Sequence, residues 1–337
     1  MPYIVKRVGQ ALIVLLLTYT LAFFLLSALP SDGVMARYAD PALGLSQAEI
    51  EAIRSEMGVD KPLLTQYVAT LTGLFTGSLG YSVRTGTPVG QLIADALPHT
   101  LALAATSVGL AIIVALATAF IATLPGAGRI GELFRAVPSL MVSLPGFWIA
   151  IVLLQLVSFE LGWINVVVPG PLEGLVLPTL TLSVPMAAPL AQVLIRSIDE
   201  VQRSPFVQVA RARGASETRI FWSDVLRNAL LPALTMAGLL FGELVGGAVV
   251  TETVFGRTGL GSMVVTAVSN RDTPVLLGVV LIAAVAYVTI NLIIDLLYPV
   301  LDVRLRTAGG PFAATPKQYA SQSADAIDVR AIETGRE

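Results

Sequence analysis

Cysteine is absent from this chain, and among its 337 residues there are only one histidine and three lysines. Without cysteine there can be no disulfide, no thiol nucleophile and no cysteine metal site. The single histidine, His99, makes no metal site on its own. None of the three lysines follows a glycine, as a Walker A nucleotide loop requires. The chain therefore carries no recognisable machinery for hydrolysing ATP.

Charge is also scarce. Charged residues make up 13% of the chain and hydrophobic residues 55%, whereas soluble domains carry about 25% charged residues. The net charge of -2 gives no case for nucleic acid as a partner. So large an apolar fraction indicates a protein whose solvent is the lipid bilayer.

The apolar residues gather in segments of about 20 residues, the length that spans a bilayer as a helix. Backbone groups in hydrocarbon must bond internally, and these segments lack the alternation of barrel strands. The sequence therefore predicts an all-α polytopic membrane protein with six transmembrane helices. The expected spans are 8–29, 100–124, 136–159, 174–195, 228–251 and 274–297. Prolines 138, 145, 178, 185 and 189 are expected to kink the third and fourth spans.

Lysine and arginine set the orientation, because they accumulate in cytoplasmic loops. Lys6 and Arg7 precede the first span, and six arginines lie in or beside the segment between the fourth and fifth. Both termini are therefore expected in the cytoplasm. The predicted division is 1–29 with the first span, an extracytoplasmic segment 30–98, a core 99–303 with a cytoplasmic loop 196–227, and a tail 304–337. The tail is expected to be disordered, since it sustains no apolar face.

The extracytoplasmic segment contains two helix signals. Ser46 and Glu49 have the spacing of a capping box, which predicts a short helix ending near Gly58. A second, amphipathic helix is expected over 63–75, ending near Gly77. The segment forms either a folded outer subdomain or a loop that only covers the helix bundle.

The segment from Arg196 to Pro232 contains two short helices joined at a glycine. Ser204 is a candidate N-cap with Pro205 at the first helical position. Gly214 is expected to end this helix in a left-handed conformation, and Ser216 to cap the next.

The first of these helices is expected to present Phe206, Val209 and Ala210 beside Arg211 and Arg213. Such a helix fits the groove of a partner protein, with the charges fixing its register. It would equally rest on lipid headgroups. The residues alone leave both interpretations open.

Several motifs together resemble the dipeptide/oligopeptide/nickel family of ABC importer permeases, in particular the first, B-type permease of the pair. Residues 208–214 (QVARARG) resemble its E-A-A-x-x-x-G loop, and 226–232 (LRNALLP) its L-R-N-A-L-x-P ending. Further matches lie at 58–67, 77–101, 251–261, 271–274 and 295–306. Gln208 stands where the motif has Glu, so a salt bridge from that position to an ATPase is not expected.

This resemblance implies a type I ABC importer permease fold and a set of partners. These are a second homologous permease, two ATPase subunits, an extracytoplasmic substrate-binding protein and membrane lipid. ATP and Mg would be used by the ATPase subunits and no cofactor by this chain, which is not an enzyme. The membrane would be the bacterial or archaeal inner membrane. The cargo would be a dipeptide, an oligopeptide, glutathione, nickel or a metal chelate. The residues implied in ATPase coupling are Pro205, Phe206, Gln208, Val209, Ala210, Arg211, Ala212, Arg213 and Gly214.

Glu243 is the candidate residue for the transport pathway. A carboxylate inside a spanning helix costs about 3 kcal/mol on insertion scales and usually faces a wet cavity or the bundle interior. It would meet a cationic part of the cargo, or it is a buried carboxyl that is protonated or paired within the bundle. Gln155 and Gln192 are weaker candidates, since such residues often bond a neighbouring helix.

Two other functions fit the sequence less well. A secondary transporter driven by an ion gradient would need several ionisable residues within its spans, and Glu243 is the one clear case besides Asp295 at an edge. An intramembrane enzyme is disfavoured, because H-E-x-x-H and G-x-S-x-G are both absent. The glycines at 256, 259 and 261 are interpreted as a turn and not as a nucleotide loop.

Overall fold

A computed structural model describes the backbone of residues 2–28, 33–38, 44–124, 126–167, 169–170 and 172–301. The predicted disordered tail, 304–337, lies outside the described residues. The chain divides into two units, Met1–Ile294 and Asp295–Glu337. The first unit contains all the described helices except the end of the last one, Thr273–Leu301.

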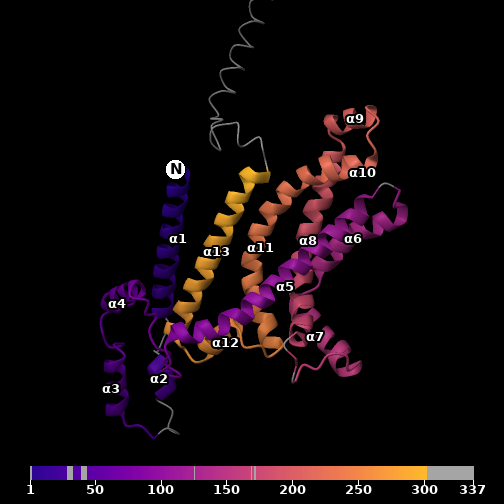
Figure 1. Cartoon of the computed structure of the whole chain (residues 1–337). Coiled ribbons are helices and arrows are strands. Elements are labelled where there is room, and N and C mark those ends of the chain that lie inside the picture. Colours follow the sequence, from indigo (N-terminus) through magenta and orange to yellow (C-terminus); the bar gives the residue numbers. More distant parts are fainter. Residues whose placement is uncertain are drawn as a thin grey trace, which may run out of the picture. The chain divides into compact units, whose positions relative to one another are not determined.

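The described residues are mostly helical, which confirms the predicted all-α membrane protein (Figure 1). Four helices are long and apolar enough to span a membrane, and two bent pairs bring the number to six if each pair is one span. The α-helices are α1 (Pro2–Ser27), α2 (Gly33–Tyr38), α3 (Gln47–Glu56), α4 (Leu63–Phe75), α5 (Val89–Thr123), α6 (Gly128–Ser143), α7 (Gly146–Leu153), α8 (Glu173–Gln202), α9 (Pro205–Ala212), α10 (Glu217–Ile220), α11 (Leu226–Val254), α12 (Leu260–Ser269) and α13 (Thr273–Leu301). Two π-helical segments are η2 (Leu154–Glu160) and η3 (Phe221–Val225).

The third predicted span differs most from the prediction. Residues 136–159 do not form one kinked helix, because α6 ends at Ser143 and meets the pair α7–η2 at 96°. Leu144, which precedes Pro145, takes an extended conformation with ψ 118°, as residues before proline prefer. The kink expected at Pro145 is therefore a full break. Pro178, Pro185 and Pro189, by contrast, lie inside α8 without ending it.

The second span also begins earlier than expected. α5 runs for 35 residues from Val89, with Pro98 inside it. The domain boundary drawn at residue 98 therefore falls within this helix. α5 connects the end that carries α12 with the end that carries α6 (Figure 1).

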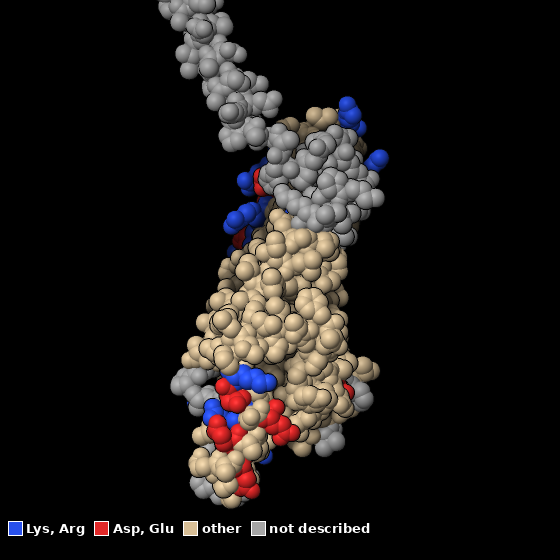
Figure 2. Space-filling view, turned by 90° about the vertical axis from the view of Figure 1, so that its left-hand side faces the viewer, with Lys and Arg blue, Asp and Glu red and all other residues tan. Residues whose placement is uncertain are grey.

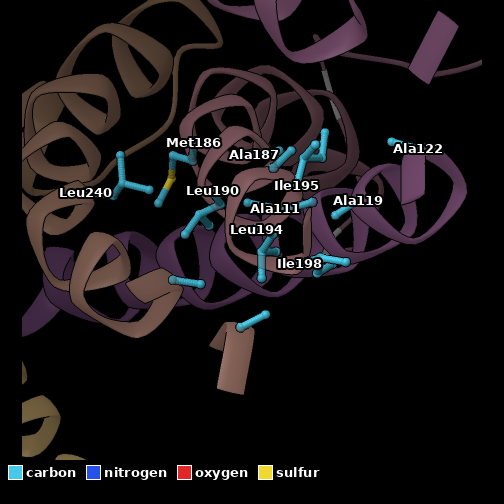
Figure 3. Close-up of a cluster of buried hydrophobic side chains, with 14 of the residues drawn as sticks. Ala111, Ala119, Ala122, Met186, Ala187, Leu190, Leu194, Ile195, Ile198 and Leu240 are labelled. Atoms are coloured by element: carbon cyan, nitrogen blue, oxygen red, sulfur yellow. The ribbon is translucent and has the colours of Figure 1, made fainter. Parts of the chain in front are cut away.

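The main core lies between α5, α8 and α11. Alanines 111, 119 and 122 of α5 are buried against large aliphatic side chains of α8, and Leu240 of α11 joins the same cluster (Figure 3). Small residues let membrane helices approach closely, so that van der Waals contact replaces the missing hydrophobic drive. This packing holds α8 against its neighbours from Leu182 to Ile198.

The surface supports a membrane-spanning orientation of the long helices. On the face shown in Figure 2, Lys, Arg, Asp and Glu gather toward the two ends, and a wide belt without charge lies between them. Leu12, Leu17 and Leu21 are exposed within the apolar span of α1. An uncharged belt of this kind matches the hydrocarbon layer of a bilayer.

The two predicted outer helices are confirmed. Ser46 and Glu49 form the reciprocal capping box at the start of α3, and the chain turns at Gly58 with φ 69°. α4 has the predicted bounds and is followed by Gly77 at φ 77°. The short helix α2 was not expected. Buried Asp272, before α13, accepts hydrogen bonds from the Ser82 hydroxyl and the Val83 amide, which ties residues 82–83 to that turn.

Candidate functional site

The segment from Arg203 to Val225 forms a helical elbow between α8 and α11, at one end of the unit (Figure 1). α9 begins at Pro205, as predicted, and Ser204 has the extended conformation of an N-cap. Ser204 is thus the N-cap residue, as predicted, but its side chain makes no capping hydrogen bond, because its hydroxyl donates to the Val201 carbonyl at 2.5 Å. The fixed φ of Pro205 favours the helix start without that cap.

Gly214 ends α9 in the predicted left-handed conformation, with φ 79°. Around it the Gly214 amide donates to Arg211 and the Ala215 amide donates back to Ala210 at 3.2 Å. No atom lies within 4 Å of a Cβ placed at Gly214, so backbone conformation alone makes glycine favourable here. Ser216 then caps α10 by accepting from the Arg219 amide, as predicted.

The inner side of the elbow is fixed to the main core. Val207 is fully buried, and Ala210 packs against the same cluster. Phe221 in η3 makes an edge contact with Phe120 of α5, with ring centroids 5.3 Å apart. Ala210 was expected on the exposed face, and that expectation is wrong. Val207 and Ala210 are three positions apart, but so are the exposed Phe206 and Val209, so this spacing alone does not identify the inner face.

The outer side of α9 presents apolar side chains. Phe206 is 45% exposed and Val209 50% exposed. Pro205, Gln208 and Ala212 lie exposed on the same short helix. Phe206 and Val209 lie three positions apart and therefore form a small apolar patch on one side of the helix.

Charged side chains flank this surface. The Arg211 guanidinium donates to both oxygens of Glu217, at 2.7 and 3.0 Å. Hydrogen bonding to Glu217 raises the pKa of Arg211 above its ordinary value, so the guanidinium stays charged. Arg203, Arg213 and Arg219 are also exposed on the elbow. The elbow therefore combines an apolar face with a strongly positive rim.

A second ion pair supports the base of the elbow. Arg135 of α6 donates to both carboxylate oxygens of Asp199 in α8, at 2.5 and 2.9 Å. Asp199 lies one turn before the end of α8, where the elbow begins. A bidentate pair of this geometry fixes the orientation of both side chains. It links α6 directly to the helix that carries α9.

The three pathway candidates do not bond one another. Glu243 lies exposed on α11, just after a 50° bend of that helix. Its carboxylate makes no hydrogen bond or ion pair with the described part of the chain. Within the described residues Glu243 is therefore neither buried nor paired. Gln192 is exposed on α8, and the Gln155 amide bonds Glu160 within its own segment.

A buried carboxylate that sequence reasoning did not single out lies at the opposite end. Glu252 accepts from the Thr100 hydroxyl at 2.6 Å and from the amides of Gly261 and Ser262. It thereby joins α5, α11 and the N-terminus of α12, where a negative charge is favourable. A Cβ at Gly259 would lie 2.2 Å from Glu252. The predicted turn lies at Gly256, with φ 61°, whereas Gly259 precedes α12 and Gly261 lies in its first turn. The missing side chains of Gly259 and Gly261 leave room for this carboxylate.

Comparison with known proteins matches nearly the whole chain. The family described as binding-protein-dependent transport system inner membrane component matches residues 120–307, and its N-terminal companion family matches residues 1–104. The chain belongs to this permease family. Membership favours a permease of an ATP-driven importer over an ion-driven secondary transporter.

Relatives of this permease carry transport names. A peptide transport system permease protein of Brucella abortus (strain 2308) is 35% identical over 311 residues, which cover 90% of this chain and 98% of the relative. The glutathione transport system permease protein GsiC of Pectobacterium atrosepticum is 36% identical over 307 residues, with the same coverage.

Solved structures agree in fold. The MetNI methionine ABC transporter, in an inward-facing conformation, aligns with a TM-score of 0.53 over 63% of this permease and 97% of that chain, at 19% identity. An amino acid ABC transporter with histidines aligns with a TM-score of 0.50 over 62% of this permease and 94% of that chain, at 17% identity. The predicted type I importer permease fold is confirmed.

Proposed function

We propose that this permease forms half of the membrane pathway for peptides or peptide-like solutes such as glutathione. The names of its relatives support this cargo class. A second homologous permease would form the other half, and an extracytoplasmic binding protein would deliver the cargo. Two ATPase subunits would use ATP and Mg, while this chain binds no cofactor.

α9 is the proposed coupling helix. The observation that carries this proposal is the division of its side chains: Val207 is locked into the core, while Phe206 and Val209 are exposed. A helix held rigidly on one side and apolar on the other can seat in the groove of an ATPase subunit. Movement of the ATPase would then pass to α8 and α11 as rigid-body gating.

The proposed orientation puts the elbow and both termini in the cytoplasm, in a bacterial or archaeal inner membrane. The exposed arginines of the elbow support it, because positively charged loops stay on the cytoplasmic side. α3 and α4 would then lie on the extracytoplasmic side. The same orientation places the elbow where ATPase subunits are found.

The absence of cysteine provides a direct test of the coupling helix. In the complete transporter, a photoreactive maleimide on Val209→Cys is expected to cross-link an ATPase subunit. The same label on Ser55→Cys, exposed on α3, is the control and is expected to give no such product. Equal cross-linking from both positions, or none from position 209, would contradict the proposal.

Glu243 is proposed to line the pathway and to meet cationic groups of the cargo. Its exposure without an ion partner in the described chain supports this role. Glu243→Gln should raise the KM for uptake of a peptide with a free amino group. The KM for uptake of an N-acetylated peptide should rise less. Glu243→Asp, which keeps the charge, is the control and should change the KM values less. Equal KM changes for the two peptides in Glu243→Gln would exclude the role.

A further inference from the structure

The outer helix α4 carries no charged residue in its 13 positions, unlike α3, which contains three acidic residues and one arginine. The rest of the protein covers only part of the apolar surface of α4. Tyr67, Leu71 and Leu74 pack against Tyr19, Phe23 and Leu277 of the spanning helices. Leu64, Val68 and Phe75 remain 69%, 55% and 88% exposed. An apolar face of this size needs an occupant.

The contacts of α4 fix its depth relative to the spanning helix α1. The Tyr67 ring packs against Phe23 and Phe24, with centroids 5.4 and 5.5 Å away, and its hydroxyl bonds Thr20. Thr20 lies inside the apolar span Arg7–Ser27. At about 1.5 Å per residue, it is on the order of 10 Å from the span's end. Interfacial helices bury their apolar faces about 5–10 Å deep, which agrees with this depth.

Several polar side chains of α4 bond within the protein, as suits surroundings poor in water. The hydroxyls of Thr70 and Thr72 donate back to carbonyls of their own helix, at 3.0 and 2.8 Å. The Gln66 amide donates to the carbonyls of Val59 and Lys61 at the start of the helix. A polar group satisfied in this way costs little when water is absent.

From these observations we infer that α4 is an interfacial helix that lies in the outer leaflet of the bilayer, with Leu64, Val68 and Phe75 in contact with lipid. In Figure 1 the helix lies beside the lower part of α1 and runs crosswise to it, as a helix in the membrane plane would. The α1 span against which α4 packs itself exposes large apolar side chains, Leu17 and Leu21 among them. Lipid is thus the occupant that packing against a lipid-facing span favours. The inference depends on the span of α1 and not on the coupling role of α9.

Single cysteines carrying a nitroxide label test this inference in the complete transporter in lipid nanodiscs. The label goes at Val68→Cys and, as a second position on the same face, at Phe75→Cys. Leu17→Cys, exposed in the middle of the α1 span, is the lipid reference. Ser55→Cys, exposed on α3, is the water reference. The measurement is the collision rate of each label with oxygen, which partitions into lipid, and with a water-soluble nickel complex.

The ratio of oxygen to nickel collisions at positions 68 and 75 is expected to be several-fold higher than at position 55 and to approach that at position 17. A ratio equal to that at position 55 would place α4 in water and overturn the inference. Immobilised labels with few collisions of either kind would show that a protein partner covers the face, which also overturns it.

Discussion

Arg211 and Glu217 face each other across the Gly214 turn and form a bidentate ion pair that closes the elbow. Both side chains are about half exposed, and exposed pairs contribute only about 0–1 kcal/mol to stability. The pair therefore sets the angle between α9 and α10 more than it stabilises the protein. With Val207 buried beneath, it makes the elbow a defined shape.

An exchange of the two charges tests this positioning role. Arg211→Glu alone should reduce ATP-dependent uptake, because two carboxylates would then repel each other at the turn. The double variant with Arg211→Glu and Glu217→Arg should recover most of the uptake, and Tm should change by no more than a few degrees. If the double variant stays as inactive as the single one, Arg211 acts through a partner and not through Glu217.

Buried Glu252 predicts a stability effect far from the elbow. Glu252→Ala would leave the amides of Gly261 and Ser262 without their acceptor. Each buried donor that loses its acceptor lowers the free energy of unfolding by about 1–3 kcal/mol. We expect a clear fall in the thermal unfolding midpoint of the purified protein. Thr253→Ala, exposed on the same helix turn, is the control and should leave the midpoint nearly unchanged. Equal midpoints for the two variants would show that the carboxylate is not needed there.

The capping box of α3 predicts a pH dependence. Hydrogen bonds from the amide and hydroxyl of Ser46 hold the pKa of Glu49 below its ordinary value of 4.5. A lowered folded pKa means that the cap is fully effective above pH 4.5 and is lost as pH falls through the lower folded value. Amide hydrogen exchange at the start of α3, corrected for the intrinsic effect of pH, should therefore accelerate in that acid range.

Glu49→Gln is the matched variant for this measurement, because glutamine can still accept at a capping box but does not titrate. Its corrected exchange rates at the start of α3 should not depend on pH in the same range. A pH dependence that persists in Glu49→Gln would assign the effect to another group.

Local signals made the helix ends predictable from the sequence. The capping box at Ser46, Pro205 at a first helical position and Gly214 at a left-handed turn each depend on neighbours within a few residues, and all three have the predicted conformations. The long apolar runs likewise predicted spans, because bilayer thickness sets their length.

Features that depend on distant residues were not predictable in this way. Glu252 meets Thr100 across 152 positions, and Asp272 meets Ser82 across 190. The sequence does not distinguish the proline that breaks a helix from those that leave it continuous. Pro145 follows the end of α6, whereas three prolines lie inside the continuous helix α8. Which face of α9 points inward depends on Val207 fitting the core, and only the packed structure shows this fit.

To couple ATP use to transport, the elbow must keep its shape. The most direct test is ATP-dependent uptake by the reconstituted transporter with substitutions at Gly214. Valine is strained at φ 79° by about 1–3 kcal/mol, whereas asparagine tolerates this conformation. Gly214→Asn should retain uptake near that of the unaltered protein, and Gly214→Val should lose most of it. Wild-type uptake by Gly214→Val would contradict the account.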